Sequence, residues 1–148
     1  SVLLSEEKEL LEGNKKTINK HMIKDFLIIN CTGKDNLVGL RVHNNFYIHK
    51  IQNSINKKDA LTGNIIDFLK KNNTNIDKNF SIIVNCGPGS FSVIRTSLAV
   101  AKGIRISKGS KLYGYNNSLL TEFNLKNIEI LIEKNLLENK LIKPLYIS

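Results

Sequence analysis

The sequence has no tryptophan, one methionine, two prolines and two cysteines among its 148 residues. Two cysteines far apart in the chain exclude a disulfide framework and offer none of the closely spaced ligand pairs of a zinc site. No apolar run approaches the roughly 20 residues that a membrane-spanning helix needs. The N-terminus lacks the basic-then-apolar layout of a secretory signal, so we expect a cytoplasmic protein with reduced thiols.

Arginine is also scarce, since 19 of the 22 basic residues are lysine and the formal net charge is +9. Bidentate recognition of phosphates and bases favours arginine, and the chain is equally rich in asparagine and isoleucine, as AT-rich coding sequence produces. The charge is therefore typical of a solvated surface. No acidic residue occurs between Asp77 and Glu122, however, and this part of the chain contains a local basic stripe. The stripe could attract RNA or an acidic partner, and its residues are Arg95, Lys102, Arg105, Lys108 and Lys111.

Residues 1–24 differ in pattern from the rest of the chain. Ser5–Leu11 resembles the start of a capped, polar helix, and a stretch rich in lysine and asparagine follows Gly13. We interpret residues 1–24 as an extension, either a loosely attached helix or residues foreign to the domain. Residues 25–148 are long enough for one domain with a sizeable core.

The hydrophobic patterns after residue 25 predict an α/β domain. Strands are predicted at 26–30, 37–42, 46–51, 80–86 and 111–115, with a possible edge strand at 144–147. Helices are predicted over 58–71, 91–107 and 128–139, and a helical turn begins at 117. Short turns make the first three strands antiparallel, whereas the fourth and fifth follow helices and run parallel to the first. The predicted sheet is mixed, five-stranded and ordered 3-2-1-4-5, with helices on its faces.

Two predicted helices have distinct apolar stripes. The helix over 91–107 is expected to turn Ile94, Leu98 and Ala101 inward, with Ile104 as a further candidate, which leaves other small or apolar residues for an association surface. The inward residues of the helix over 58–71 are expected to be Leu61, Ile65, Ile66, Phe68 and Leu69.

The most informative segment is Cys-Gly-Pro-Gly-Ser-Phe-Ser-Val-Ile-Arg, residues 86–95. A strand that passes through a glycine-rich turn into a helix exposes backbone N–H groups, which can hold an anion or contact another protein. Pro88 removes one N–H and no P-loop lysine follows, so a structural turn with a serine cap is the interpretation that we favour. Cys31 and Cys86, which end neighbouring strands, are expected at the same rim, and the residues of the weak anion site are Thr32, Gly33, Gly87, Gly89 and Ser90.

Catalytic constellations are not evident. His43 and His49 flank the predicted hairpin and lie at no motif distance from a nucleophile or second ligand. The serines of the 86–97 segment likewise lack a base partner at a recognisable spacing. We therefore expect no catalytic residue, metal site or cofactor in this chain.

Residues 85–103 closely resemble the signature G-P-G-S-F-T-G-x-R-x-G-x-x-x-A-K-G of the TsaB (YeaZ) family. The resemblance extends over residues 25 to about 120. Residues 28–32 take the place of the family's opening strand and D-T-S turn. Weaker similarity to the family's first helix, its G-V-S-S-L strand and its C-terminal P-x-Y is found at 65–71, 111–119 and 143–147.

The resemblance implies the actin/hexokinase/Hsp70-type (ribonuclease H-like) fold and a non-catalytic scaffold role in threonylcarbamoyladenosine synthesis on tRNA. It implies as partners the metal-containing transferase subunit TsaD, a paralogue, and the P-loop ATPase TsaE. The small and apolar residues on the outer side of the helix over 91–107 leave a homodimer as an alternative, and we expect only indirect or weak contact with tRNA. The family's pairing surface includes the helix after the signature. The expected partner-binding residues are therefore Ser90, Phe91, Arg95, Ala99, Val100, Lys102 and Gly103.

Several positions depart from the family pattern. Asn30 replaces the first-strand aspartate, and Ser92, Val93 and Ser97 replace a threonine and two glycines of the signature. The second lobe of the usual two-part fold is expected to be mostly absent. An asparagine supplies no charge for a hard cation, so a nucleotide site is disfavoured. The alternatives are a small nucleotide-dependent ATPase or phosphotransferase of the same fold and a basic RNA-binding module over residues 95–111.

Overall fold

The computed structural model describes residues 23–52 and 58–139. Residues 1–22 of the predicted extension over 1–24, and the edge strand predicted at 144–147, lie outside these ranges. The described elements are β1 (Phe26–Cys31), β2 (Asn36–Val42), β3 (Asn45–Lys50), α2 (Lys58–Lys71), β4 (Ser81–Asn85), α3 (Phe91–Lys108), β5 (Lys111–Tyr115), the 3-10 helix η3 (Asn117–Leu119) and α4 (Leu125–Glu133).

The sheet has the predicted order β3-β2-β1-β4-β5. β1 pairs antiparallel with β2 and parallel with β4, which in turn pairs parallel with β5. The β2–β3 hairpin turns at His43 and Asn44, with φ of 54° and 64°, and β3 begins at Asn45, one residue earlier than the predicted strand. Positive φ at both central residues matches the twist of the flanking strands, and asparagine tolerates it well.

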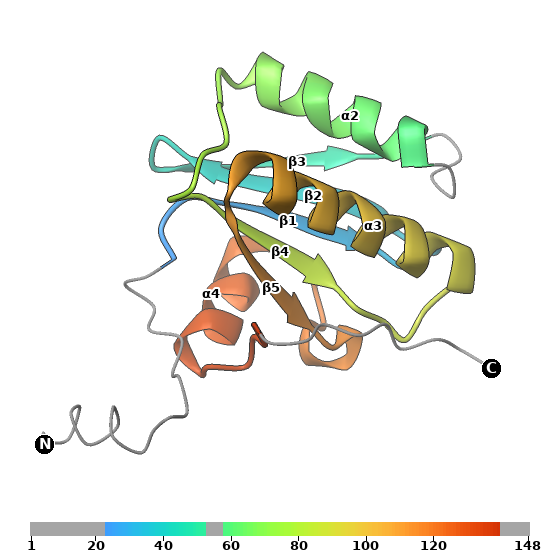
Figure 1. Cartoon of the computed structure of the whole chain (residues 1–148). Coiled ribbons are helices and arrows are strands. Elements are labelled where there is room, and N and C mark those ends of the chain that lie inside the picture. Colours follow the sequence, from blue (N-terminus) through green and yellow to red (C-terminus); the bar gives the residue numbers. More distant parts are fainter. Residues whose placement is uncertain (1–22, 53–57, 140–148) are drawn as a thin grey trace, which may run out of the picture.

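Helices cover both faces of the sheet, as Figure 1 shows, with α2 and α3 on one face and α4 on the other. Side chains alternate along each strand, so Leu27 and Ile29 join the core beneath α2 and α3, whereas Phe26 and Ile28 join the core beneath α4. Because β1 and β4 are covered on both sides, residues 26–29 and 82–84 are continuous apolar runs. No helix within residues 23–52 and 58–139 has the length and apolar content to cross a membrane.

The buried surface of α3 is wider than its sequence pattern indicates. Val93 and Val100 are buried together with the predicted inward residues, so the expectation of an exposed Val100 is wrong. The reason is that α3 packs on the sheet and also alongside α2, which buries two adjacent faces of one helix. Conversely, Ile66 of α2 was expected inside and is 44% exposed.

The last helix is shorter than predicted. α4 begins after Asn124, whose side chain accepts a hydrogen bond from the Asn127 backbone N–H at 2.8 Å, and it ends at Glu133. Asn135 then adopts a left-handed φ of 56°. The chain turns there and places Leu137 in the core, while Glu138 forms a bridge with Gly114 of β5. Tertiary pairing with β5 therefore ends a helix that propensity alone would extend.

Candidate functional site

The two glycine-containing loops lie side by side beyond the ends of β1 and β4, as predicted. The Ser90 backbone N–H donates to the Thr32 carbonyl at 2.9 Å. A Cβ added at Gly89 would lie 2.8 Å from the Thr32 Cβ, and one added at Gly33 would lie 2.8 Å from the Ser90 Cβ. Gly33 also has a φ of +100°. The glycines therefore allow the close approach of one loop to the other.

Backbone N–H groups of the 87–90 loop, which a bound anion would need as donors, are already hydrogen-bonded within the chain. The Gly87 N–H donates to Asn85 Oδ1 at 2.8 Å, the Ser90 N–H is bonded to Thr32, and Pro88 has none. Ser90 occupies the N-cap position of α3, but its side chain makes no capping hydrogen bond, contrary to the prediction of a serine cap. This geometry favours the structural-turn interpretation of the segment over the weak anion site.

A buried polar network joins the ends of β1, β4 and β5 behind these loops. Asn85, which is 0% exposed, donates from Nδ2 to Asn30 Oδ1 at 2.7 Å and to Asn117 Oδ1 at 2.9 Å. The Tyr115 hydroxyl donates to Asn30 Oδ1 at 2.6 Å. The Asn117 backbone N–H closes the network by donating to the Gly87 carbonyl at 2.7 Å. Three strands and η3 are thus held together by neutral groups.

The network has no negative charge. Burial raises the pKa of Tyr115 well above its ordinary value, so the phenol is a neutral donor to Asn30. Within residues 23–52 and 58–139 no group of three or more histidine, cysteine or carboxylate side chains is placed to hold a metal ion. Asn30 is half-buried, and its Oδ1 accepts from two neutral donors, Asn85 and Tyr115. The arrangement is suited to fixing the loops rather than to positioning magnesium.

Asn85, Tyr115 and Asn117 were missed as network members in the sequence analysis. A signal was present, because Asn85 is a polar residue at the end of the fully apolar run Ile82–Val84. A buried polar side chain in such a place needs hydrogen-bond partners from neighbouring strands.

Both thiols lie at this rim, as expected from the predicted strand order. Cys31 and Cys86 are free and buried. Burial raises the pKa of Cys31 to about 12 and that of Cys86 to about 11. Since the thiolate is the reactive form, neither residue is built as a nucleophile.

We expect both thiols to resist alkylation in the folded protein. At pH 8, three pH units or more below the pKa of either thiol, the thiolate fraction is about one in a thousand or less. Iodoacetamide followed by intact mass measurement should detect no rapid modification, whereas two additions should appear rapidly in 8 M urea. Fast labelling of either cysteine without denaturant would contradict this assignment.

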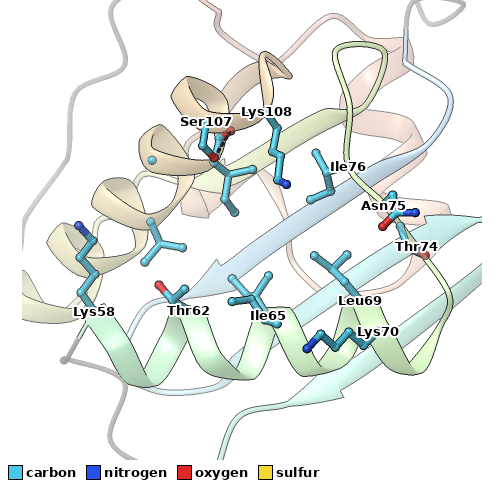
Figure 2. Close-up of a pocket in the computed structure, with 14 residues that line it drawn as sticks. Lys58, Thr62, Ile65, Leu69, Lys70, Thr74, Asn75, Ile76, Ser107 and Lys108 are labelled. Carbon is cyan, nitrogen blue, oxygen red and sulfur yellow. Dashed lines mark hydrogen bonds between the residues drawn. The ribbon is translucent and has the colours of Figure 1, made fainter.

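A groove of about 510 Å³ lies between α2 and α3, outside the core that these two helices cover. We refer to it as the α2–α3 groove. Ile65, Val100 and Ile76 are buried at its floor, and Ile66 and Ile104 are more accessible. Figure 2 shows Lys58 at one end of α2, Lys70 toward the other end, and Lys108 across the groove on α3. The remaining lining residues are Thr62, Leu69, Thr74, Asn75, Gly103 and Ser107.

The predicted partner-binding residues do not form one continuous surface. Val100 and Gly103 line the α2–α3 groove. Arg95 and Ala99 line a shallower hollow of about 270 Å³, and the Arg95 guanidinium carbon lies 5.5 Å from the centre of the Phe91 ring. Lys102 is exposed and lines neither hollow, and Ser90 stays with the rim loops.

The sequence analysis did not predict that α2 contributes to the α2–α3 groove. Ile66 is 44% exposed and lines the α2–α3 groove, although the sequence pattern placed it in the core. It adjoins the inward residue Ile65, so helical spacing alone assigned it to the buried side. Only the distance between the two helices decides its exposure.

Comparison with solved structures identifies the fold. YeaZ from Pseudomonas aeruginosa matches with a TM-score of 0.56 and 16% sequence identity over 65% of this chain and 46% of its own. An uncharacterized protein from the same organism, described as similar to peptidase YeaZ, matches with a TM-score of 0.54 and 16% identity over 64% of this chain and 44% of its own. No family model and no curated protein sequence matches this chain. The chain spans less than half the length of these two proteins, and within that span it has the ribonuclease H-like fold of YeaZ.

Proposed function

We propose that this chain is a TsaB-like accessory subunit that supports threonylcarbamoyladenosine modification of tRNA by binding a TsaD-like partner through the α2–α3 groove. A TsaE-like ATPase would join that pair. The observation that carries the proposal is the combination of the YeaZ fold with an apolar groove on the helical face that includes the signature helix α3.

The chemistry of the rim supports an accessory role. Asn30 accepts two hydrogen bonds from neutral donors, so the residue in place of the family's aspartate is already committed to the network. The N–H groups of Gly87 and Ser90 are bonded within the chain. Phosphoryl transfer needs charges and free donors aimed at phosphate oxygens. In this proposal the reactive groups belong to the partner subunit.

The groove has the features of an association surface. Its floor is apolar and already shaped by the packing of α2 against α3, and desolvated pockets of this kind hold the dominant side chains of an interface. Ile66 and Ile104 present apolar surface at its sides. A partner helix that inserts leucine-sized side chains here would bury surface that the isolated chain leaves in water.

We expect Ile66→Glu to weaken binding of the TsaD-like paralogue by tenfold or more, because it places a carboxylate at the apolar side of the groove. Ile106→Glu is the matched control, since Ile106 is on α3, is 78% exposed and does not line the groove. Isothermal titration calorimetry with the purified paralogue measures both affinities, and circular dichroism verifies the fold.

Three results would count against the proposed function. The first is no complex at micromolar concentrations, and the second is equal weakening by both glutamate variants. The third is tight, magnesium-dependent ATP binding by the isolated chain, which would instead favour a nucleotide-dependent enzyme of this fold. Native mass spectrometry of the same samples separates a heterodimer from a homodimer.

A further inference from the structure

The lysines around the α2–α3 groove give it a charge as well as a shape. Lys58, Lys70 and Lys108 are exposed and line it, and no acidic side chain of residues 23–52 or 58–139 is among its lining residues. Carboxylates beside these three ammonium groups would gain an electrostatic attraction that a purely apolar ligand lacks. The groove therefore favours a segment that combines apolar side chains with carboxylates.

The chain itself contains such a segment. Residues 2–12 read Val-Leu-Leu-Ser-Glu-Glu-Lys-Glu-Leu-Leu-Glu and hold four of the chain's 13 acidic residues, with a single lysine. Leu3 and Leu10 are seven residues apart, as are Leu4 and Leu11, which is the spacing of two helical turns. Apolar pairs with nearby glutamates complement a groove with an apolar floor and lysines at its edges.

The length of the linker bears on whether this contact can form within one molecule. The Asp25 carbonyl accepts from the Ser81 N–H at 3.2 Å, and Ser81 follows the groove residue Ile76 by five positions. Ile23 is buried in the core beneath α4, so the chain reaches the domain on the other face of the sheet and the linker must pass the edge of the sheet to reach the groove. Residues 13–22 form this linker, and ten residues can span at most about 33–36 Å. The 14 residues of α2 extend over about 21 Å, so a fully extended linker is longer than α2.

We propose that residues 2–12 of the same chain occupy the α2–α3 groove, with leucines against its apolar floor and glutamates beside its lysines. A tether of this length gives a high effective concentration, so modest intrinsic affinity is enough. The proposal goes beyond the function proposed above and does not depend on it, because no second protein is involved. If both hold, the segment and the partner subunit compete for one surface.

Carbodiimide cross-linking of the full-length chain tests this contact, because it joins carboxylates and lysines that touch. At low protein concentration we expect links within the monomer from Glu6, Glu7, Glu9 or Glu12 to the groove lysines. Leu10→Asp/Leu11→Asp should reduce these links at least fivefold, although it adds carboxylates, whereas Leu10→Met/Leu11→Met should preserve them. Amide NMR shifts of Thr62 and Gly103 should change in the aspartate variant and those of α4 should not.

The proposal is overturned if links to Lys24, Lys111 and Lys126 are as frequent as links to Lys58, Lys70 and Lys108, since that pattern reflects the tether alone. It is equally overturned if the links occur only between two chains, which would make a second copy the occupant. Unchanged groove shifts in Leu10→Asp/Leu11→Asp would also reject it. None of these outcomes involves the TsaD-like paralogue, so failure here is distinguishable from failure of the proposed function.

Discussion

Asn85→Ala should unfold at a markedly lower urea concentration than the wild-type chain, with a loss of about 3 kcal/mol or more in the free energy of unfolding. The substitution removes two donated hydrogen bonds, to Asn30 and Asn117, and the acceptor of the Gly87 N–H. Each lost hydrogen bond costs about 0.5–1.5 kcal/mol, and the buried Gly87 N–H, left without its acceptor, costs about 1–3 kcal/mol. Equilibrium urea unfolding followed by circular dichroism measures the difference.

Asn85→Asp separates hydrogen bonding from the loss of volume, because the side chains are nearly isosteric. At pH 7 the carboxylate cannot donate, so its oxygens face the Oδ1 atoms of Asn30 and Asn117 without a proton between them. Burial raises the pKa of such a group above its unfolded value, and the protonated acid can again donate one hydrogen bond. Stability relative to wild type should therefore recover as the pH falls from 7 toward 4.

Asn79→Ala is the control for the Asn85 variants, since Asn79 is exposed and lies just before the same strand. It should change the free energy of unfolding by no more than about 0.5 kcal/mol. Equal losses in Asn79→Ala and Asn85→Ala, or a pH-independent Asn85→Asp, would show that the network does not hold the rim together.

Gly89→Ala should destabilise the fold by about 1–3 kcal/mol, because an added methyl has no room at the contact between the two loops. Its Cβ would lie 2.8 Å from the Thr32 Cβ, 3.0 Å from the Thr32 carbonyl oxygen and 3.2 Å from the Ile94 Cδ1. The carbonyl belongs to backbone that is hydrogen-bonded to Ser90, so it cannot move away without breaking that bond. Thermal unfolding measured by circular dichroism reads out the change.

Gly63→Ala provides the opposite expectation for the same chemical change. Gly63 is within α2, and a methyl group added there would meet no atom of a neighbouring element within 4 Å. Alanine should therefore raise stability by about 0.5–1 kcal/mol through helix propensity. If Gly89→Ala is neutral or stabilising, the loops are less closely packed than described. Comparing Gly89→Ala with Gly63→Ala thus tests whether glycine is needed at position 89 for the close packing of the two loops.

The order of the sheet could be predicted from sequence because it depends on local features. Short turns after β1 and β2 force antiparallel neighbours, and helices before β4 and β5 force parallel crossovers of one hand. The adjacency of Thr32 and the Gly87–Ser90 loop followed from that order. The family resemblance of residues 85–103 likewise depended only on a contiguous run of residue types.

Side-chain properties that depend on how two elements pack together could be read only from the tertiary structure. Val100 is buried and Ile66 exposed because α2 and α3 pack side by side with a groove between them, and helical spacing carries no information on that separation. Asn85 became a network residue only when Asn30 and Asn117 were brought to it from other parts of the chain. Sequence by itself determined which elements form and how they connect, through local propensity and turn length. Side-chain exposure and hydrogen-bond pairing were decided by the fold, because both are properties of surfaces that meet only after the chain has folded.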